Sequence, residues 1–388
     1  MRRPWWLGVV VFVLAAGSSP AESQRPRLAA GADSNDATVY MRLANELQLD
    51  TAPGSLAAAE SAFVWASRLA PGNADPYYAR GVAILRVLYR GMFYGPVQYG
   101  RRPDSANAAV ADRVGLLFRQ AWLRDPFKDP LLDPSLQIGV LPRASTVSDP
   151  IIRGIVEFFG AEFPKARDDW ARALQHHPNR IDLRFHRAYS YSLEQRFDSA
   201  AAELQQAITT IASRDSASYA AFAPPRDLLY YALAVAREQA GDTAGAHDAY
   251  VKALSENLGL YLVHARLARL LLGQGDTTGG LMELSIAAGV EPHDAWMRNY
   301  YGLVLLATKR YPEAVQELQA AIDADPYYAS PYYLLGRADE AMGSAALALQ
   351  AYRDFLAHAA VTDSRWGWVT LRVGELQSLV GDSVAHDD

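Results

Sequence analysis

Residues 241–246 read GDTAGA and residues 275–280 read GDTTGG, so the same short pattern returns after 34 positions. The period continues on both sides of this pair. Self-similarity at a fixed spacing of this length indicates a repeat array, in which each repeat is one supersecondary unit. Two series of small residues keep the register over four units: Ala246, Gly280, Ala314 and Ala348, and Ala234, Ala268, Gly302 and Gly336.

Each position of the unit has a physical reason. A small residue is needed where two helices cross closely, and an aromatic residue or leucine fills the space that is left. A proline follows the second helix and opens the next unit, because proline is tolerated only at a helix start. Gly241-Asp242 and Gly275-Asp276 supply a left-handed residue and then a capping acid, while Pro164 and Pro312 stand where a second helix begins. Each unit is therefore predicted to be two helices joined by a tight turn.

The order of positions within the unit matches a known family. Counted back from Pro326, the unit carries Ala321, Leu318 and Ala314, and Gly336 follows ten residues after the proline. With this pattern the chain resembles tetratricopeptide-repeat proteins, of a bacterial exported type. The resemblance implies an all-α fold, a right-handed superhelical solenoid of about eight helix-turn-helix units with a C-terminal capping helix. The units are expected at about 40–73, 74–128, 147–180, 181–226, 227–260, 261–294, 295–328 and 329–362.

The chain begins with a segment that is typical of a signal peptide, over residues 1–21. Arg2 and Arg3 precede an apolar run from Leu7 to Ala16, and cleavage is expected after Ala21. We therefore expect an exported protein, periplasmic or extracellular; a retained membrane anchor is the alternative. The other expected segments are a polar N-terminal segment (22–38), N-terminal units (39–128) with an insertion at 90–107, a proline-rich connecting loop (129–146), middle units (147–226), the regular array (227–362), and the capping helix with an acidic tail (363–388).

Composition narrows the class of protein. Of the 388 residues 50% are hydrophobic, which excludes a disordered chain, and 37 basic against 43 acidic residues give a net charge of −6. This balance gives no reason to expect nucleic acid as a partner. After the leader no stretch is long and apolar enough to span a bilayer, so no membrane span is expected in the mature chain. The absence of cysteine excludes disulfides, thiolate metal sites and cysteine nucleophiles.

The sequence carries no motif of catalysis that we recognise. It has neither a G-x-S-x-G elbow nor a Walker phosphate loop, and Gly273–Gly280 is interpreted as the turn of a repeat. His176 and His177 are adjacent on a helix, where side chains diverge by about 100°, and make a poor metal site. Asp168 and Asp169 fall early in a helix, where acids suit the dipole and the solvent. We expect no enzyme, no catalytic residue, no cofactor and no metal.

The resemblance also implies where a partner would bind. In the family the first helix of each unit supplies most of the concave face, at its second, fifth, ninth, twelfth and thirteenth positions. Aromatic side chains with a few isolated charges stand at these positions, which suits an extended peptide or a partner's helix. The alternative is that the rings pack against neighbouring units or an inserted loop. The predicted groove comprises Phe185, Tyr189, Tyr231, Glu238, Gln239, Arg269, Trp296, Asn299, Tyr333, Arg337 and Glu340.

The insertion at 90–107 adds a candidate contact loop. Four large apolar or aromatic side chains, Met92, Phe93, Tyr94 and Tyr99, lie within it. That is much apolar surface for a solvated loop, so the loop is predicted either to contact a partner or to pack against its own unit.

Three functions are compatible with these features. The leading hypothesis is an exported, non-enzymatic scaffold that binds a peptide or partner protein in its groove. The first alternative is a structural subunit of a larger cell-surface assembly, with self-association of the array. The second is an accessory protein that handles glycans, with Trp296 and Tyr333 as stacking platforms.

Overall fold

The computed structural model describes residues 24–48, 50, 54–88, 105–127, 144–212 and 224–386. Within these ranges it contains seventeen α helices, one 3-10 helix and no strand. The predicted signal peptide and the candidate contact loop with Met92, Phe93, Tyr94 and Tyr99 lie outside the described residues. The helices are α2 (Ala37–Leu47), α3 (Ser55–Leu69), α4 (Asp75–Leu88), α5 (Ser105–Arg124), α6 (Pro150–Phe159), α7 (Phe163–His176), α8 (Ile181–Leu193), α9 (Phe197–Ala212), α10 (Arg226–Gln239), α11 (Thr243–Glu256), α12 (Tyr261–Gly273), α13 (Thr277–Val290), α14 (Ala295–Ala307), α15 (Tyr311–Ala324), α16 (Ser330–Ala341), α17 (Ala345–His358) and α18 (Trp366–His386); the 3-10 helix η3 is Ala144–Thr146.

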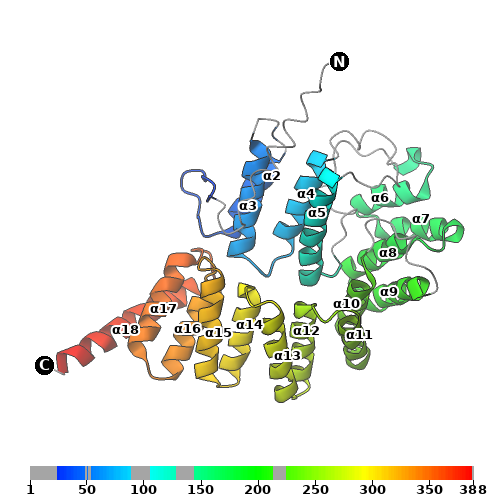
Figure 1. Ribbon diagram of the computed structural model, residues 1–388. Helices are drawn as coiled ribbons and strands as arrows, with labels where there is room; N and C mark the ends of the chain where they lie inside the picture. Colours follow the sequence, from blue (N-terminus) through cyan, green and yellow to red (C-terminus); the bar gives the residue numbers. More distant parts are fainter. Residues whose placement is uncertain are drawn as a thin grey trace.

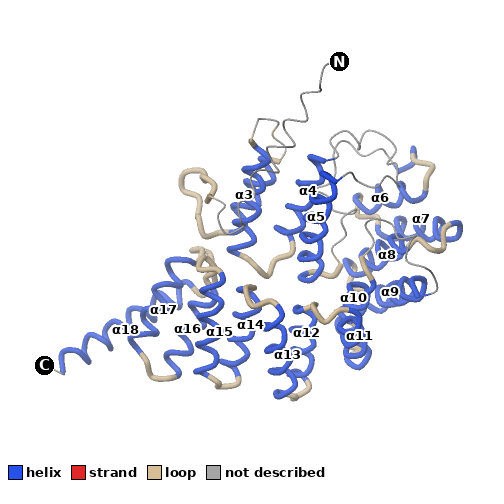
Figure 2. The backbone as a smooth tube through the Cα atoms, in the orientation of Figure 1, coloured by secondary structure: helices blue, strands red, loops and turns tan. Residues whose placement is uncertain are grey.

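Consecutive helices pack as pairs, from α2–α3 through α16–α17, and α18 covers the last pair (Figures 1 and 2). Val369 and Leu376 of α18 are buried against the α16–α17 pair. The predicted all-α solenoid of about eight helix-turn-helix units with a C-terminal capping helix is thereby confirmed. No helix in the described part of the chain combines the length and the apolar character that crossing a membrane requires.

The small residues of the repeat stand where helices cross. A Cβ added at Gly336 would lie 2.5 Å from the ring of Tyr352, and one at Gly302 would lie 2.7 Å from Leu318. Gly81 has the same relation to Phe118 at 2.7 Å. These distances are below van der Waals contact, so the first helix can approach the large side chain of the second only without a side chain of its own. The small residues recur in the sequence because the two helices of each unit cross closely at these positions.

The turn within a pair uses a left-handed residue two positions before the second helix. Gly241, Gly275 and Gly343 adopt φ values of 84°, 87° and 80°. Asp242 and Asp276 follow the first two and accept hydrogen bonds from the backbone N–H of Gly245 and Gly279, as the sequence predicted. Lys309, Gln195 and Ala161 adopt the same conformation, at φ values of 62°, 58° and 58°. The geometry thus persists in units where glycine is absent.

Lys309→Gly is expected to stabilise the protein by about 1 kcal/mol, since the left-handed region costs a residue with a Cβ about that much. Gly343→Ala places a Cβ in the same turn of the next unit and is expected to lose a similar amount. Urea unfolding followed by circular dichroism measures both variants. A lower unfolding midpoint for Lys309→Gly would contradict the expectation.

The third pair corrects one interpretation of the sequence. Asp169 was expected to face solvent with Asp168, but its side chain is fully buried. It forms ion pairs with Arg153 of α6 and with Arg172 of its own helix. Position 169 lies on the face of α7 that packs on α6, beside the buried ring of Trp170, so the acid is retained inside the pair by its two arginine partners.

The array bends until its beginning meets its later units (Figure 1). The Arg68 guanidinium at the end of α3 pairs with Asp325, with a Nε–Oδ2 distance of 3.0 Å, and Arg124 at the end of α5 pairs with Asp294 at 2.9 Å. The rings of Trp65 and Tyr327 meet edge to face, with centroids 4.8 Å apart.

These pairs join the first two units to the turns before α14 and α16. We call them the closure contact. The segment before α2 extends it, because the Asp33 carboxylate accepts a hydrogen bond from the backbone N–H of Val361 at 3.0 Å.

Candidate functional site

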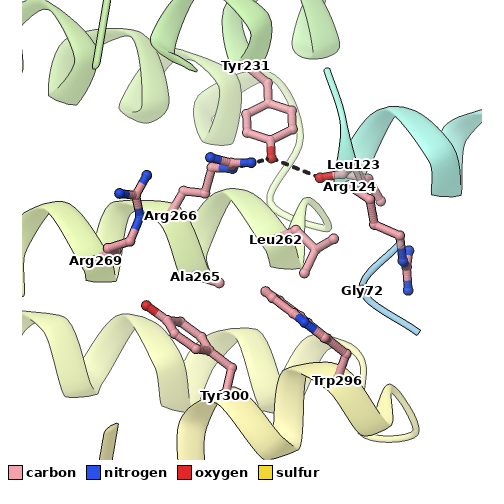
Figure 3. A pocket seen from close by; sticks show the side chains of 10 residues that line it. All are labelled: Gly72, Leu123, Arg124, Tyr231, Leu262, Ala265, Arg266, Arg269, Trp296 and Tyr300. Atoms are coloured by element: carbon pink, nitrogen blue, oxygen red, sulfur yellow. Dashed lines mark hydrogen bonds between the residues drawn. The ribbon is translucent and has the colours of Figure 1, made fainter. Parts of the chain in front are cut away.

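A cavity of about 280 Å³ lies beside the closure contact (Figure 3). Helices α10, α12 and α14, each the first helix of its pair, form one part of its wall. The α3–α4 turn and the end of α5 form the other part. The lining residues are Gly72, Leu123, Arg124, Tyr231, Leu262, Ala265, Arg266, Arg269, Trp296 and Tyr300.

Arg124 fixes the wall that comes from the first two units. Its side chain is only 4% exposed, and besides the ion pair with Asp294 its Nε donates to the Pro71 carbonyl at 2.6 Å. The guanidinium also lies 4.2 Å from the ring centroid of Tyr77. Further hydrogen bonds of this cation go to Gln120 of its own helix, and Figure 3 shows the side chain pointing toward Gly72.

Tyr231 links the two walls. It is fully buried, and its hydroxyl donates to the Leu123 carbonyl at 2.8 Å across the closure contact. The same hydroxyl oxygen accepts a hydrogen bond from Nε of Arg266, also at 2.8 Å. Tyr231 thus holds the Arg266 guanidinium at the cavity wall.

The rings of Trp296 and Tyr300 form an aromatic wall on α14. They are stacked, with centroids 5.5 Å apart and planes 14° from parallel. Gly72 lies against the indole, because a Cβ at that position would be 2.4 Å from Nε1 of Trp296. The aromatic wall and the first two units therefore meet only because residue 72 has no side chain.

The structure brings three predicted groove residues together, since Tyr231, Arg269 and Trp296 all line this cavity. Glu238 lies beside it and pairs with Arg269 at 2.7 Å. Its carboxylate also accepts a hydrogen bond from the hydroxyl of Tyr250 at 2.6 Å. A role for these four residues in binding stays a prediction.

The other predicted groove residues lie apart from the cavity. Phe185 is buried in the core, and Tyr189 packs on Phe158 with ring centroids 5.6 Å apart. Gln239 is exposed and borders a separate hollow at the α8–α9 turn. Asn299 is buried, and its side-chain amide donates to the Tyr328 hydroxyl at 3.3 Å.

The last unit holds the remaining three. Tyr333 packs on Phe355 and Trp368, and its hydroxyl accepts a hydrogen bond from the exposed Arg337 at 3.2 Å. Glu340 accepts a hydrogen bond from the Tyr352 hydroxyl at 2.5 Å and one from Nε of Arg372 at 2.6 Å. Their binding role also stays a prediction.

Sequence reasoning missed two central members of the cavity. Arg266 and Tyr300 are 34 residues apart and occupy the sixth position of their units, directly after a position that the sequence analysis used. Their shared position in the 34-residue repeat could have predicted that both face the same side of the array. Gly72, Leu123 and Arg124 carried no such signal, since their place depends on how far the whole array bends.

Buried tyrosines are expected to make the folded state less stable at high pH. Burial raises the pKa of Tyr328 to about 12, and burial together with the hydrogen bond to Glu238 raises the pKa of Tyr250 above its ordinary value of 10.0. A phenol whose pKa is higher in the folded state contributes stability below pH 10 that is lost as the pH rises through the folded value. We expect helix content to fall above about pH 10, and the ultraviolet tyrosinate signal to rise later than in urea. Identical tyrosinate titrations with and without urea would contradict this.

In the portion of the chain described by the structure, no three His, Cys, Asp or Glu side chains are grouped so that they could hold a metal ion.

Comparison with known protein families identifies the repeat in part of the chain. Residues 265–329, which run from α12 through the turn after α15 and include two of the cavity's helices, match the family described as tetratricopeptide repeat. This segment of the chain carries tetratricopeptide repeats. These repeats supply Arg266, Arg269, Trp296 and Tyr300 to the cavity.

A curated relative is an uncharacterized protein of Haemophilus influenzae, which is 30% identical over 77 residues. The match covers 20% of this chain and 43% of the relative, so this chain spans less than half the length of that protein.

Three solved structures are similar to parts of this chain. The C-terminal part of a TPR repeat-containing protein from Cytophaga hutchinsonii has a TM-score of 0.48 at 13% identity, over 60% of this chain and 89% of that one. YrrB, titled a TPR protein with an unusual peptide-binding site, has a TM-score of 0.40 at 16% identity, over 53% and 97%. MamA has a TM-score of 0.37 at 17% identity, over 45% and 94%.

Proposed function

We propose that this protein is an exported, non-enzymatic interaction module that binds a peptide or partner protein at the cavity between the closure contact and helices α10, α12 and α14. The observation that carries the proposal is the convergence of side chains from three successive first helices on one hollow, with stacked rings and three guanidinium groups in its wall. Aromatic and arginine side chains in pockets contribute most of the binding free energy at protein interfaces.

The tetratricopeptide repeats support this proposal, because stacked helix pairs present extended surfaces that bind other proteins. Export is proposed from the leader-like residues 1–21. The partner would then be a protein of the periplasm or of the cell exterior.

A photo-crosslinking amino acid in place of Tyr300 tests the proposal from inside the cavity. The same reagent in place of Leu371, which is 72% exposed on α18, is the matched control. Crosslinking in the native envelope is expected to give one protein in stoichiometric amount from position 300 and none from position 371. That adduct is expected to vanish when Trp296→Ala is added. Equal adducts from both positions would contradict the proposal.

The same experiment distinguishes the alternatives. An adduct between two copies of this chain from position 300 would favour the structural subunit, and a monomer in light scattering would count against it. Saccharide binding that is lost in Trp296→Ala, with no protein adduct, would favour glycan handling.

A further inference from the structure

Arg266 differs from the two other arginines of the cavity in its partners. Arg124 is paired with Asp294, and Arg269 with Glu238. Arg266 donates to the hydroxyl of Tyr231, and no carboxylate of the described residues lies within ion-pair distance of it. Arg266 lines the cavity, so its guanidinium is placed where a ligand in that space can reach it.

The nearby acids are engaged elsewhere. The Asp294 carboxylate binds Arg124 and accepts a hydrogen bond from the Tyr261 hydroxyl at 2.7 Å. Glu238 binds Arg269 and Tyr250, and the Asp125 carboxylate accepts a hydrogen bond from the backbone N–H of Phe127. A guanidinium that lacks a carboxylate partner inside a protein prefers an anion with two oxygens, because its donors match that geometry.

The other walls define the rest of the ligand. Leu262, Ala265 and the stacked rings of Trp296 and Tyr300 are apolar or aromatic, and they lie within reach of Arg266 in the same cavity (Figure 3). A volume of about 280 Å³ is at the small end of ligand pockets, which typically hold roughly 300–1,000 Å³. It has room for one flat apolar group next to a carboxylate.

We propose that this cavity binds the carboxylate of an aromatic acid at Arg266, and that occupation of the cavity stabilises the closure contact. The source is either a free small acid or the end of a partner's chain. The second part follows because Gly72 and Leu123 belong to the first two units, so the cavity is complete only while those units lie against α10, α12 and α14. The inference deepens the proposed function and rests on it for the location of the site.

Benzoate and its neutral analogue benzamide are the probes, titrated calorimetrically into the mature full-length chain at constant ionic strength. Benzoate is expected to bind about 10-fold or more tightly than benzamide. Arg266→Gln is expected to weaken benzoate binding about 10- to 100-fold. The control Arg310→Gln removes an arginine that pairs with Glu313 on the surface and does not line the cavity, and it is expected to leave benzoate affinity unchanged within about 2-fold.

Linkage to closure is tested with Arg68→Gln, since Arg68 belongs to the closure contact but does not line the cavity. Binding of benzoate to this variant is expected to be about 5-fold or more weaker, because the ligand must then also restore the closed arrangement. Unchanged affinity would overturn the linkage.

Peptides that end in phenylalanine distinguish the sources. Binding of the free acid but not of the amidated peptide supports the end of a chain, and binding of benzoate without either peptide supports a small acid. Equal affinity for benzoate and benzamide in the unmodified protein overturns the inference, whether or not Arg266→Gln folds. That result would leave the crosslinking test of the proposed function unaffected.

Discussion

Replacement of Arg124 by methionine is expected to destabilise the folded chain by about 3–5 kcal/mol, the cost of removing one partner of a buried ion pair. The Arg124 and Asp294 side chains are 4% and 9% exposed, so the remaining carboxylate would be held away from water without its cation. The Pro71 carbonyl would lose its hydrogen bond to Nε as well. Methionine keeps the volume of the aliphatic stem, so the loss reports the charge and its hydrogen bonds.

The matched control is Arg310→Met, because Arg310 pairs with Glu313 on the surface and both side chains are more than two-fifths exposed. An exposed pair contributes little, so no measurable change is expected there. Chemical unfolding gives the free energies, and hydrogen exchange gives the location. Loss of amide protection in the α3–α4 turn and α5 is expected for Arg124→Met. Equal stabilities of the two variants would show that the closure contact contributes nothing to the fold.

Trp170→Ala is expected to cost a comparable amount, about 3–5 kcal/mol, which is typical of a large aromatic side chain removed from a core. The Trp170 ring is completely buried between α6, α7 and α8. Phe158 and His186 lie against it with ring centroids at 6.1 and 5.3 Å, and a Cβ at Gly154 would be 2.5 Å from its Nε1. Alanine in place of this ring is therefore expected to leave a cavity in the core.

Because each repeat contacts mainly its neighbours, the damage is expected to stay local. Hydrogen exchange in Trp170→Ala should show α6 and α7 exchanging first, while α12 to α17 keep their protection. Leu371→Ala truncates a side chain that is 72% exposed and is expected to stay within about 0.5 kcal/mol of the unmodified protein. Uniform loss of protection along the whole chain would contradict local damage.

The helix pairs were predictable because each rests on contacts between residues close in sequence. Gly336 and Tyr352 are 16 positions apart, and Gly275 lies in a turn of its own unit. Both features lie within one 34-residue unit, so the repeat in the sequence predicts them. The burial of Asp169 was not predictable from its place early in a helix, because its partner Arg153 comes from the preceding helix.

The cavity was predictable only in part, for a related reason. Tyr231, Arg269 and Trp296 occupy repeat positions that face a common side. The opposite wall depends on the bend accumulated over six units, and small differences in each crossing add up along the array. Arg68 and Asp325 are 257 positions apart, and the sequence around either residue gives no signal that predicts this ion pair.

The hydrogen bond between Asp33 and Val361 has a consequence for how the protein is made. Synthesis proceeds from the N-terminus, so Asp33 leaves the ribosome 328 residues before Val361, whose backbone N–H donates to its carboxylate. Arg68 and Arg124 of the first two units therefore lack their ion-pair partners, Asp325 and Asp294, until most of the chain has been synthesised. The later units thus complete the first ones, and a chain truncated before residue 294 would leave Arg68 and Arg124 without Asp325 and Asp294.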